Sequence, residues 1–443
     1  MKLKYALSLT TAFCLTIVPQ ALMAQTVPNL GNYQDLNGNF RIGIQATNAI
    51  NGFSLSRSFE QDTIDEIIDF LDPTEIALVI GQLNAQSAEI SQVFDLRGAT
   101  ALAGYQQNGT TLSISFVSPS GDLVSLDDGT SCSFTFQGIT RQDAFNQFDT
   151  ILDDGNNATA RQVYSCLGRS FTRFSPIDPL AGNPNSLQAS LARSALDLTS
   201  SDSLIEEGTN TYGDPWIIGA AATTGSAGRF DYQRVDARVQ RGFRVFAGNR
   251  ALLKFDLPVS YSNIKGAASY TAQVGLGVEV PLIDTKWSIE PRVSYGVVYS
   301  DNAGSVGHIL QGSVVSRYVV QGLGRGRLVI GNMVAYSSTL ATPGDYNLNP
   351  DIKNWVFRNG LAYELPLKGG VGGRSSSLRA SYAHTLFAGD KLFNRSFHEA
   401  TISFGLRGRE ESVRAARDLI RFNLNTVQAN GYQSYTAGIG FRF

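Results

Sequence analysis

Charged side chains recur at every second position in the C-terminal half of the chain. In RVDARVQRGFRVF, residues 234–246, arginine and aspartate alternate with valine, alanine and phenylalanine. Because successive side chains of a strand point to opposite faces, these charges share one face of a sheet. The same parity through the later segments places nine basic and six acidic residues on that face: Arg234, Arg238, Arg244, Lys254, Arg292, Arg317, Arg358, Arg379 and Arg421, with Asp236, Asp256, Glu279, Glu290, Glu364 and Glu399.

This set of charges has two possible roles. Rings of arginine inside a pore would favour anions, because charged rings set the selectivity of channels. Alternatively, groups of opposite sign would pair with one another and form a structural ladder that fills a closed interior around a helix. The mixture of signs in similar number favours the ladder, because a channel for acidic solutes would carry a clearer excess of arginine.

The three histidines do not predict a catalytic site. His308, His384 and His398 share the parity of apolar neighbours, so we expect them on the outward face. A hydrolase would need a serine and a histidine within hydrogen-bond reach of each other. We therefore expect no enzyme.

Two acidic turns resemble calcium loops only in part. Asp127-Asp128-Gly129 and residues 153–157, DDGNN, lack the spaced acidic ligands and the glutamate at position 12 of such loops. Turn chemistry explains both, and no Cys/His cluster has metal-ligand spacing. We expect neither a metal nor a cofactor.

The N-terminus has the features of a cleaved signal peptide. Lys2 and Lys4 precede a mostly apolar run from Tyr5 to Val18, and Ala24 is a plausible last residue before cleavage. The run is too short for a membrane span. Residues 1–24 are therefore predicted to be removed from an exported protein.

Export bears on the cysteines. Cys14 leaves with the signal, and Cys132 and Cys166 remain. A pair of cysteines in an oxidising compartment usually forms a disulfide. We expect that disulfide, with two buried free thiols as the alternative.

The composition indicates a sheet-rich protein. Only 17% of the residues are charged, whereas about 25% is usual for soluble domains, and the chain carries 44 glycines and 10% aromatic residues. The net charge of -2 gives no general attraction to nucleic acid, so we expect no such partner. After the signal peptide the sequence has no run of 18 apolar residues, so it predicts no transmembrane helix.

Residues 25–185 are predicted to form an α+β domain. Asp72-Pro73 begins a helix, and the preceding FEQDTIDEIIDFL (59–71) forms a second helix packed against it. The segments ATALAGY, TLSISFV, DLVSL and SCSFTFQ have the composition of strands. One further helix begins at Thr140, another holds Cys166, and the proline-rich residues 175–185 form a linker.

The next segment, residues 186–213, is predicted to be a linker helix. Leu187, Leu191 and Leu198 fall roughly on one helical face between positions 186 and 208.

From residue 214 onward the hydrophobic period is two. We predict about twelve strands of about ten to fourteen residues, longer than the usual five or six. Their apolar faces begin or end in aromatic residues, as in the aromatic girdles of membrane barrels: Tyr261, Tyr270, Trp287, Tyr299, Trp355, Tyr363 and Tyr435. In lipid a sheet must close, because an open edge leaves unpaired amides. The predicted fold is a C-terminal antiparallel transmembrane β-barrel at 214–443, preceded by the small α+β domain and the linker helix.

The connections predict the direction of the barrel. An even number of strands puts both ends of the barrel on one side, which we expect to be periplasmic. Tight turns at 247–250, 283–286 and 321–325 fall on that side, and the longest connection, residues 339–350, falls on the outer side.

The chain ends in a pattern that resembles the C-terminal assembly signal of bacterial outer-membrane barrels. Its matching positions are Tyr435, Ala437, Ile439, Phe441 and Phe443. With the signal peptide, the globular segment, the helix and the barrel, the architecture of residues 186–443 resembles an autotransporter of type V secretion. In that family the barrel is the translocator, and a helix preceding it lies in the pore.

The resemblance implies a function and partners. We expect an outer-membrane translocator in a Gram-negative bacterium, assembled by the barrel-assembly machinery and periplasmic chaperones, in contact with lipid and lipopolysaccharide. The N-terminal domain is short, lacks the usual repeats and holds the expected disulfide, which would hinder threading through a narrow pore. These departures favour a domain that stays periplasmic or plugs the barrel over a secreted one, and its location is left open between the periplasm and the cell surface. Two alternatives are a channel plugged or gated by that domain, and a surface-exposed structural or adhesive protein.

Overall fold

The computed structural model describes residues 33–199, 216–245, 251–283, 286–300, 305–341, 350–367, 374–407 and 418–442. The predicted signal peptide and Phe443 lie outside these ranges. Within them, no helix is long and apolar enough to cross a membrane.

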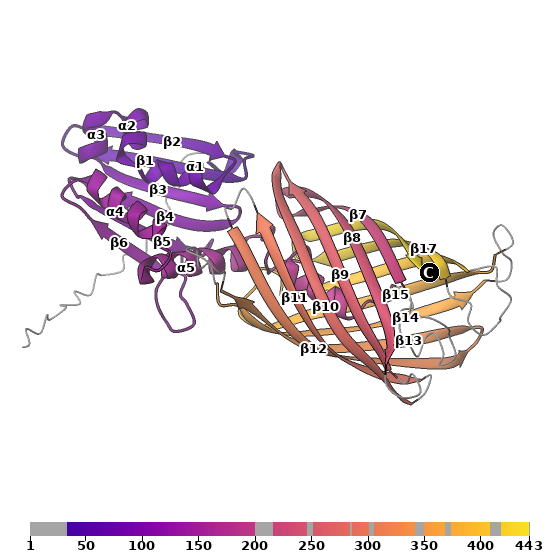
Figure 1. Cartoon of the computed structure of the whole chain (residues 1–443). Helices are drawn as coiled ribbons and strands as arrows, with labels where there is room; N and C mark the ends of the chain where they lie inside the picture. Colours follow the sequence, from indigo (N-terminus) through magenta and orange to yellow (C-terminus); the bar gives the residue numbers. More distant parts are fainter. Residues whose placement is uncertain are drawn as a thin grey trace, which may run out of the picture.

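The N-terminal domain is a six-stranded antiparallel sheet with helices packed on it (Figure 1). The strand order is β2-β1-β3-β4-β5-β6. The strands are β1 (Phe40–Asn48), β2 (Phe53–Gln61), β3 (Glu89–Leu96), β4 (Ala99–Tyr105), β5 (Thr111–Val117) and β6 (Ser133–Gln137). The helices are η1 (Tyr33–Asp35), α1 (Ile64–Ile68), η2 (Asp69–Leu71), α2 (Pro73–Ile80), α3 (Gln82–Ser87), α4 (Arg141–Asp153) and α5 (Ala158–Phe174).

Local capping explains where the helices begin. Asp72 accepts a hydrogen bond from the Thr74 amide at 2.7 Å, and Pro73 occupies the first turn of α2. Thr140 and Asp143 form a reciprocal capping box at the start of α4. These two predicted helix starts are confirmed.

Other local predictions were wrong. Residues 59–61 belong to strand β2 and not to a helix, because they pair with β1 from Phe40 to Ile42. The segment DLVSL, residues 122–126, makes only isolated bridges. The sequence did not predict β1, β2 and β3 as strands.

A disulfide joins the sheet side of the domain to α5. Cys132 and Cys166 are both fully buried, with an S–S distance of 2.03 Å. They lie in the domain's main core, which also holds Ile42, Ile76 and Phe148.

The C-terminal part is a closed barrel of twelve antiparallel strands, as predicted. Each strand pairs with its neighbours in the chain, and β18 pairs with β7 to close the sheet. The strands are β7 (Trp216–Ala227), β8 (Phe230–Val245), β9 (Ala251–Ile264), β10 (Ala267–Ile283), β11 (Trp287–Ser300), β12 (Ser305–Leu323), β13 (Gly326–Leu340), β14 (Lys353–Pro366), β15 (Ser376–Gly389), β16 (Ser396–Arg407), β17 (Asp418–Ala429) and β18 (Tyr432–Arg442).

The outer face of the barrel is apolar and aromatic. Tyr261, Tyr270 and Tyr299 are cross-strand neighbours and are all exposed, as are Trp355 and Tyr435. Tyr270 lies 5.2 Å from Tyr261 and 6.4 Å from Tyr299 between ring centroids. An exposed apolar band with aromatic rows is typical of an outer-membrane-type barrel.

The two ends of the barrel differ. The terminus end is where β7 begins at Trp216 and β18 finishes at Arg442. The domain end is the opposite end, where the turns after β7 and β9 contact the N-terminal domain (Figure 1). The strand directions place the connection at 341–352 at the domain end and the turn at 324–325 at the terminus end.

The chain enters the lumen of the barrel from the domain end. Residues 175–199, here called the pore segment, follow α5 at the domain end and contain α6 (Leu187–Ala195). Ser186 is the N-cap of α6, and Leu196 is its C-cap. The predicted helix over 186–208 was therefore too long, since residues 196–199 are not helical and residues 200–215 lie outside the described ranges.

Candidate functional site

The lumen of the barrel and the pore segment form the candidate functional site. The pore segment is buried along almost its entire length, including Leu187, Ala189, Leu191 and Leu196. Helix α6 contacts β10–β13 and so lies against one side of the barrel.

Leucines of the pore segment sit on inward-facing glycines of this wall. A Cβ added at any of four glycines would lie 2.6–2.9 Å from a leucine methyl carbon, too close for a real contact. The absence of side chains therefore makes room for the leucines. The pairs are Leu180 with Gly307, Leu187 with Gly296, Leu196 with Gly331, and Leu198 with Gly360.

The inner wall on this side is apolar, which the sequence did not predict. Val315, Val319 and Met333 are 1–2% exposed and belong to one cluster with Leu196 and Leu198. Period-two parity cannot show that an inward face is covered by a segment more than a hundred residues away.

The predicted inward charges lie on the inner wall. By strand register and burial, the structure places Arg234, Asp236, Arg238, Arg244, Lys254, Asp256, Glu279, Glu290, Arg292, Arg358, Glu364, Arg379 and Arg421 there. Arg317 and Glu399 are also buried and inward.

Most of these charges form two ion-pair networks within the wall. In one, the Lys254 Nζ lies 2.8 Å from Glu279 and 2.9 Å from Glu290, and Arg317 lies 2.9 Å from Glu290. Arg292 pairs with Asp256 beside them. In the other network, Glu364 lies 3.3 Å from Arg327, 3.1 Å from Arg379 and 3.5 Å from Arg421.

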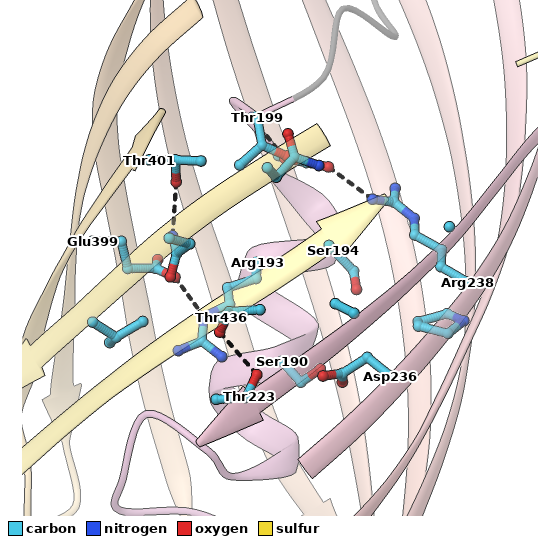
Figure 2. A pocket seen from close by; sticks show the side chains of 18 of the residues that line it. Ser190, Arg193, Ser194, Thr199, Thr223, Asp236, Arg238, Glu399, Thr401 and Thr436 are labelled. Carbon is cyan, nitrogen blue, oxygen red and sulfur yellow. Dashed lines mark hydrogen bonds and ion pairs between the residues drawn. The ribbon is translucent and has the colours of Figure 1, made fainter. Parts of the chain in front are cut away.

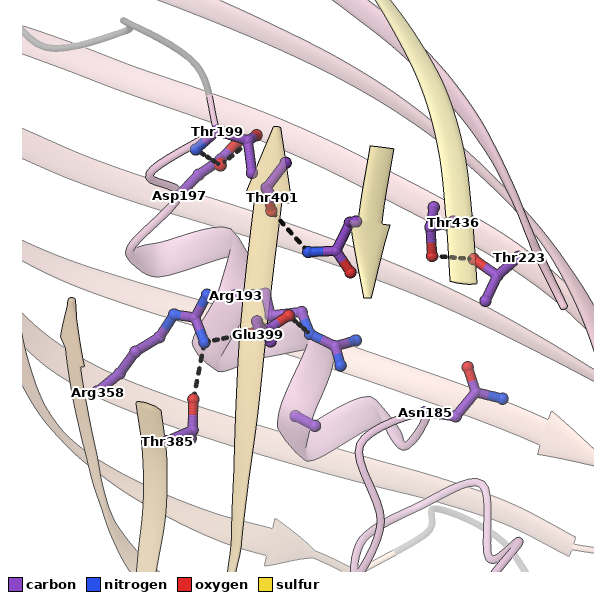
Figure 3. Close-up of polar contacts among 12 residues, drawn as sticks. Asn185, Arg193, Asp197, Thr199, Thr223, Arg358, Thr385, Glu399, Thr401 and Thr436 are labelled. Atoms are coloured by element: carbon purple, nitrogen blue, oxygen red, sulfur yellow. Dashed lines mark hydrogen bonds and ion pairs between the residues drawn. The ribbon is translucent and has the colours of Figure 1, made fainter. Parts of the chain in front are cut away.

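A third network joins the wall to α6. The Arg193 Nε lies 2.7 Å from Glu399, which also pairs with Arg358 (Figure 3). Arg238 pairs with Asp197 of the pore segment at 2.9 Å. Arg193 and Asp197 were not among the predicted site residues. The resemblance implied a helix in the pore, but strand parity does not assign partners on a separate element. The pairing of opposite charges favours the structural ladder over a ring of free arginines.

A cavity of about 310 Å³ lies on the other side of α6 (Figure 2). Ser190, Arg193 and Ser194 line it from the helix, and β7, β8 and β16–β18 line it from the wall. Along β18 its lining extends from Tyr432 to Gly440, which corresponds to about 26 Å of strand. Its wall side chains are mainly hydroxyls, amides and paired charges, such as Thr223 with Thr436 at 2.8 Å.

Apolar residues fill the lumen at the domain end. Ile177 and Ala181 of the pore segment cluster with Phe230, Tyr232 and Tyr432 of the wall, all at most 5% exposed. The hydroxyls of Tyr232 and Tyr432 contact each other. This cluster packs the start of the pore segment against the wall beneath the N-terminal domain.

The N-terminal domain is bound to the rim of the barrel through Arg169. Its side chain is 2% exposed and pairs with Asp127 of the domain. It also donates to the main-chain oxygens of Pro350 at 3.1 Å and Asp351 at 2.9 Å, and lies 3.5 Å from Asp390. The hydrogen bond and charge of Arg169 lower the pKa of the Asp127 carboxyl, although burial opposes this.

Other rim contacts are spread over the turns of the domain end. The Phe393 and Asn394 amides donate to the Thr172 and Gly182 oxygens at 2.9 and 2.8 Å. Asn39 donates to the Lys265 oxygen at 3.2 Å. No local pattern in the sequence indicates these contacts, because each joins residues far apart in the chain.

One buried acid lies in the pore segment near the domain. Burial raises the pKa of the Asp178 carboxyl to about 7, opposed by hydrogen bonds from the Ala181 and Leu180 amides and by the charge of Arg97. Burial also lowers the pKa of Arg97 to about 10, and Asp178 partly offsets this.

The remaining candidates have ordinary roles. The Nδ1 atoms of His308 and His398 are hydrogen-bonded to the hydroxyls of the outward residues Tyr295 and Tyr382, at 2.5 and 2.6 Å. Asp128 accepts from the Thr130 amide at 2.8 Å within its turn. Among the described residues no group of three or more His, Cys, Asp or Glu is arranged to hold a metal.

The described part of the C-terminal assembly signal lies on β18. Tyr435 and Phe441 are exposed on the outer face, and Ala437 and Ile439 share their parity opposite Ala222 and Ala220 of β7. Phe443 lies outside the described residues.

No family model matches the chain, and no curated protein matches its sequence. Solved structures similar to it include the β domain of the Bordetella autotransporter BrkA, at 10% identity and a TM-score of 0.38, over 51% of this chain and 98% of that one. The translocator domain of the autotransporter NalP from Neisseria meningitidis is similar at 15% identity and a TM-score of 0.40, over 58% of this chain and 96% of that one. The KdgM porin is similar at 10% identity and a TM-score of 0.30, over 51% of this chain and 99% of that one. These similarities concern the barrel, and the function proposed below rests on the geometry of this chain.

Proposed function

We propose that this protein is an outer-membrane translocator that presents its own N-terminal domain at the outer end of its barrel. The observation that supports this proposal is the path of the chain. The domain lies at one end of the barrel, both barrel termini lie at the other, and the pore segment runs from the domain end into the lumen. If the barrel termini face the periplasm, the domain faces the outside.

The contacts at the rim also support a domain that remains docked on the barrel. Arg169 is completely buried between the domain and two barrel connections, and a domain released into the medium would leave those partners unpaired. The expected product is therefore a displayed cap on the barrel.

Protease accessibility on intact cells tests this proposal. An epitope belongs in the turn at 49–52, because Ala49 and Ile50 are exposed and lie at the end of the domain away from the barrel. The turn at 127–130 is unsuitable, since Asp127 takes part in docking. Removal of the epitope from intact cells supports display, and protection until the outer membrane is permeabilised overturns it.

A plugged or gated channel is the second candidate function, favoured by the cavity beside α6. In this case the Arg193–Glu399 pair would hold the helix in place, and its loss would open the lumen. Conductance in planar bilayers distinguishes the candidates. A steady current from the unmodified protein supports the channel, and a barrel that stays closed with or without Glu399→Gln argues against it.

Assembly by the barrel-assembly machinery and its periplasmic chaperones belongs to the same proposal, on the strength of the C-terminal pattern. Phe443→Asp should prevent formation of a heat-modifiable barrel in the outer membrane. Normal assembly of this variant would contradict a role for Phe443 in assembly.

A further inference from the structure

Three arginines of the inner wall donate to main-chain oxygens of the pore segment. Arg234 of β8 donates from Nη1 to the Asn185 oxygen at 2.7 Å. The Nε atoms of Arg358 on β14 and Arg379 on β15 donate to the oxygens of Leu196 and Leu198, at 3.0 and 2.8 Å. We call Arg234, Arg358 and Arg379 the carbonyl-binding arginines.

Each carbonyl-binding arginine is held by an acid of the wall. Arg234 lies 2.7 Å from Asp236, Arg379 lies 3.1 Å from Glu364, and Arg358 pairs with Glu399. Arginine has five N–H donors in a rigid fork, so a guanidinium fixed by a carboxylate can still donate to a carbonyl. The same arrangement thus occurs three times, on three strands.

The three oxygens share one property. Asn185 precedes the N-cap of α6, Leu196 is its C-cap, and Leu198 follows it, so none is inside the helix. Their oxygens are available because the backbone there is not helical. Every residue of a polypeptide carries such an oxygen, whatever its side chain.

We propose that the carbonyl-binding arginines form a binding site for extended polypeptide main chain, and that this site holds successive stretches of the N-terminal domain as they pass through the barrel. The ligand is an unfolded polypeptide recognised by its carbonyl oxygens. The contacts with Asn185, Leu196 and Leu198 are those that remain when passage stops. This inference rests on the translocator function proposed above.

The test measures how fast the 49–52 epitope becomes accessible to protease on intact cells after a pulse of synthesis, in the full-length protein. The variant Arg234→Lys/Arg358→Lys/Arg379→Lys keeps a cation for each acid and loses the planar fork of donors. We expect the barrel to assemble normally, as judged by heat modifiability, and the epitope to appear several-fold more slowly. The three single variants, each expected to show a smaller delay, replace the triple variant if it does not assemble.

Arg421→Lys is the matched control. Arg421 is also a buried wall arginine held by acids, and its hydrogen bonds go to wall side chains, including Ser403 and Asp418. We expect no delay in this variant. A delay equal to that of the triple variant would overturn the proposal, because the effect would then follow from wall charge in general.

A second pair of variants separates main chain from side chain. Asn185→Ala removes the Asn185 Oδ1, which also accepts from the Arg234 Nη1 at 2.8 Å, and Leu198→Met changes an apolar side chain. Both variants leave the main-chain oxygens in place. We expect the epitope of these variants to reach the surface at the normal rate. A delay as long as that of the arginine variants would show that the site recognises side chains and not the main chain.

The outcomes distinguish this inference from the proposed function. An epitope that reaches the surface at the same rate in the wild type and in the arginine variants overturns only the inference. An epitope that never reaches the surface in the wild type overturns both.

Discussion

Loss of Arg169 should release the N-terminal domain from the barrel without unfolding either part. Arg169→Ala removes the hydrogen bonds to the Pro350 and Asp351 oxygens and leaves Asp127 and Asp390 without their shared cation. Breaking a buried ion pair costs about 3–5 kcal/mol. The Asp127 side chain is 52% exposed and can regain water, so we expect the lower limit, about 3 kcal/mol.

This free energy predicts a measurable change in proteolysis. Docking buries the junction at Ser175 and Pro176, which lies between Gly98 of the domain and Gly228 of the barrel. Since 1.4 kcal/mol is a factor of ten in an equilibrium, the undocked population should rise about 100-fold. Cleavage at the 175–176 junction by proteinase K should accelerate by a similar factor when opening is fast relative to cleavage. The domain should survive as a resistant fragment, because the disulfide and its core do not involve Arg169.

Arg173→Ala is the matched control. It lies one turn later on α5 and donates to the Ser125 oxygen of its own domain at 3.3 Å. We expect little change in the cleavage rate. Equal rates for wild type and Arg169→Ala would refute the reasoning, and so would digestion of the domain as fast as of the linker, since that would indicate unfolding instead of undocking.

Three more changes test other parts of the structure. Gly331→Val should displace Leu196 and Leu198 from the wall and lower the temperature at which the pore segment becomes accessible to protease. Gly312→Val, at an outward glycine with open space around it, should not lower that temperature. Equal effects of the two variants would contradict the packing of the leucines on the wall glycines. The folded-state pKa of Asp178 is raised to about 7, so burial of this carboxyl costs no stability below about pH 4, the cost grows between about pH 4 and 7, and it is constant above pH 7. Asp178→Asn should therefore be more stable than wild type at pH 8 and show a flatter dependence between pH 4 and 8 in urea unfolding; an unchanged slope would contradict the burial of a charged carboxyl. Cys132→Ser should abolish the mobility difference between reduced and oxidised protein and, for a loop closed over 34 residues, destabilise the domain by about 4 kcal/mol, as measured by urea unfolding; a wild type that shows no mobility difference would exclude the disulfide.

The barrel could be predicted because its strands alternate strictly. Residues such as Tyr270 and Gln273 face lipid and lumen in turn, so the period of two and the aromatic ends determine both faces. The lengths and order of the strands then followed from the turns between them. These are local properties of the sequence.

The N-terminal strands were harder to predict. In β1 the first four residues are all buried, because the strand is central and covered on both faces, so the alternation disappears. In β2 the segment that ends in Phe59 and Glu60 runs directly into α1, and its acidic and apolar residues suit either element.

The site could be predicted only in part. Parity located the inward charges but not their partners in the pore segment, since Arg193 and Asp197 lie on a separate element. The contacts of Arg169 with Pro350 and Asp351 join residues about 180 positions apart. The predicted helix over 186–208 was too long because propensity does not show that Arg358 and Arg379 bind the oxygens of Leu196 and Leu198.

The most direct test of the account is the orientation of the two barrel ends, measured by labelling with a membrane-impermeant maleimide on intact cells. Ala49→Cys places a thiol at the tip of the domain, and Arg325→Cys places one in an exposed turn at the terminus end. We expect position 49 to be labelled on intact cells and position 325 to be labelled only after the outer membrane is permeabilised. Labelling of position 325 on intact cells, with position 49 protected, would contradict it.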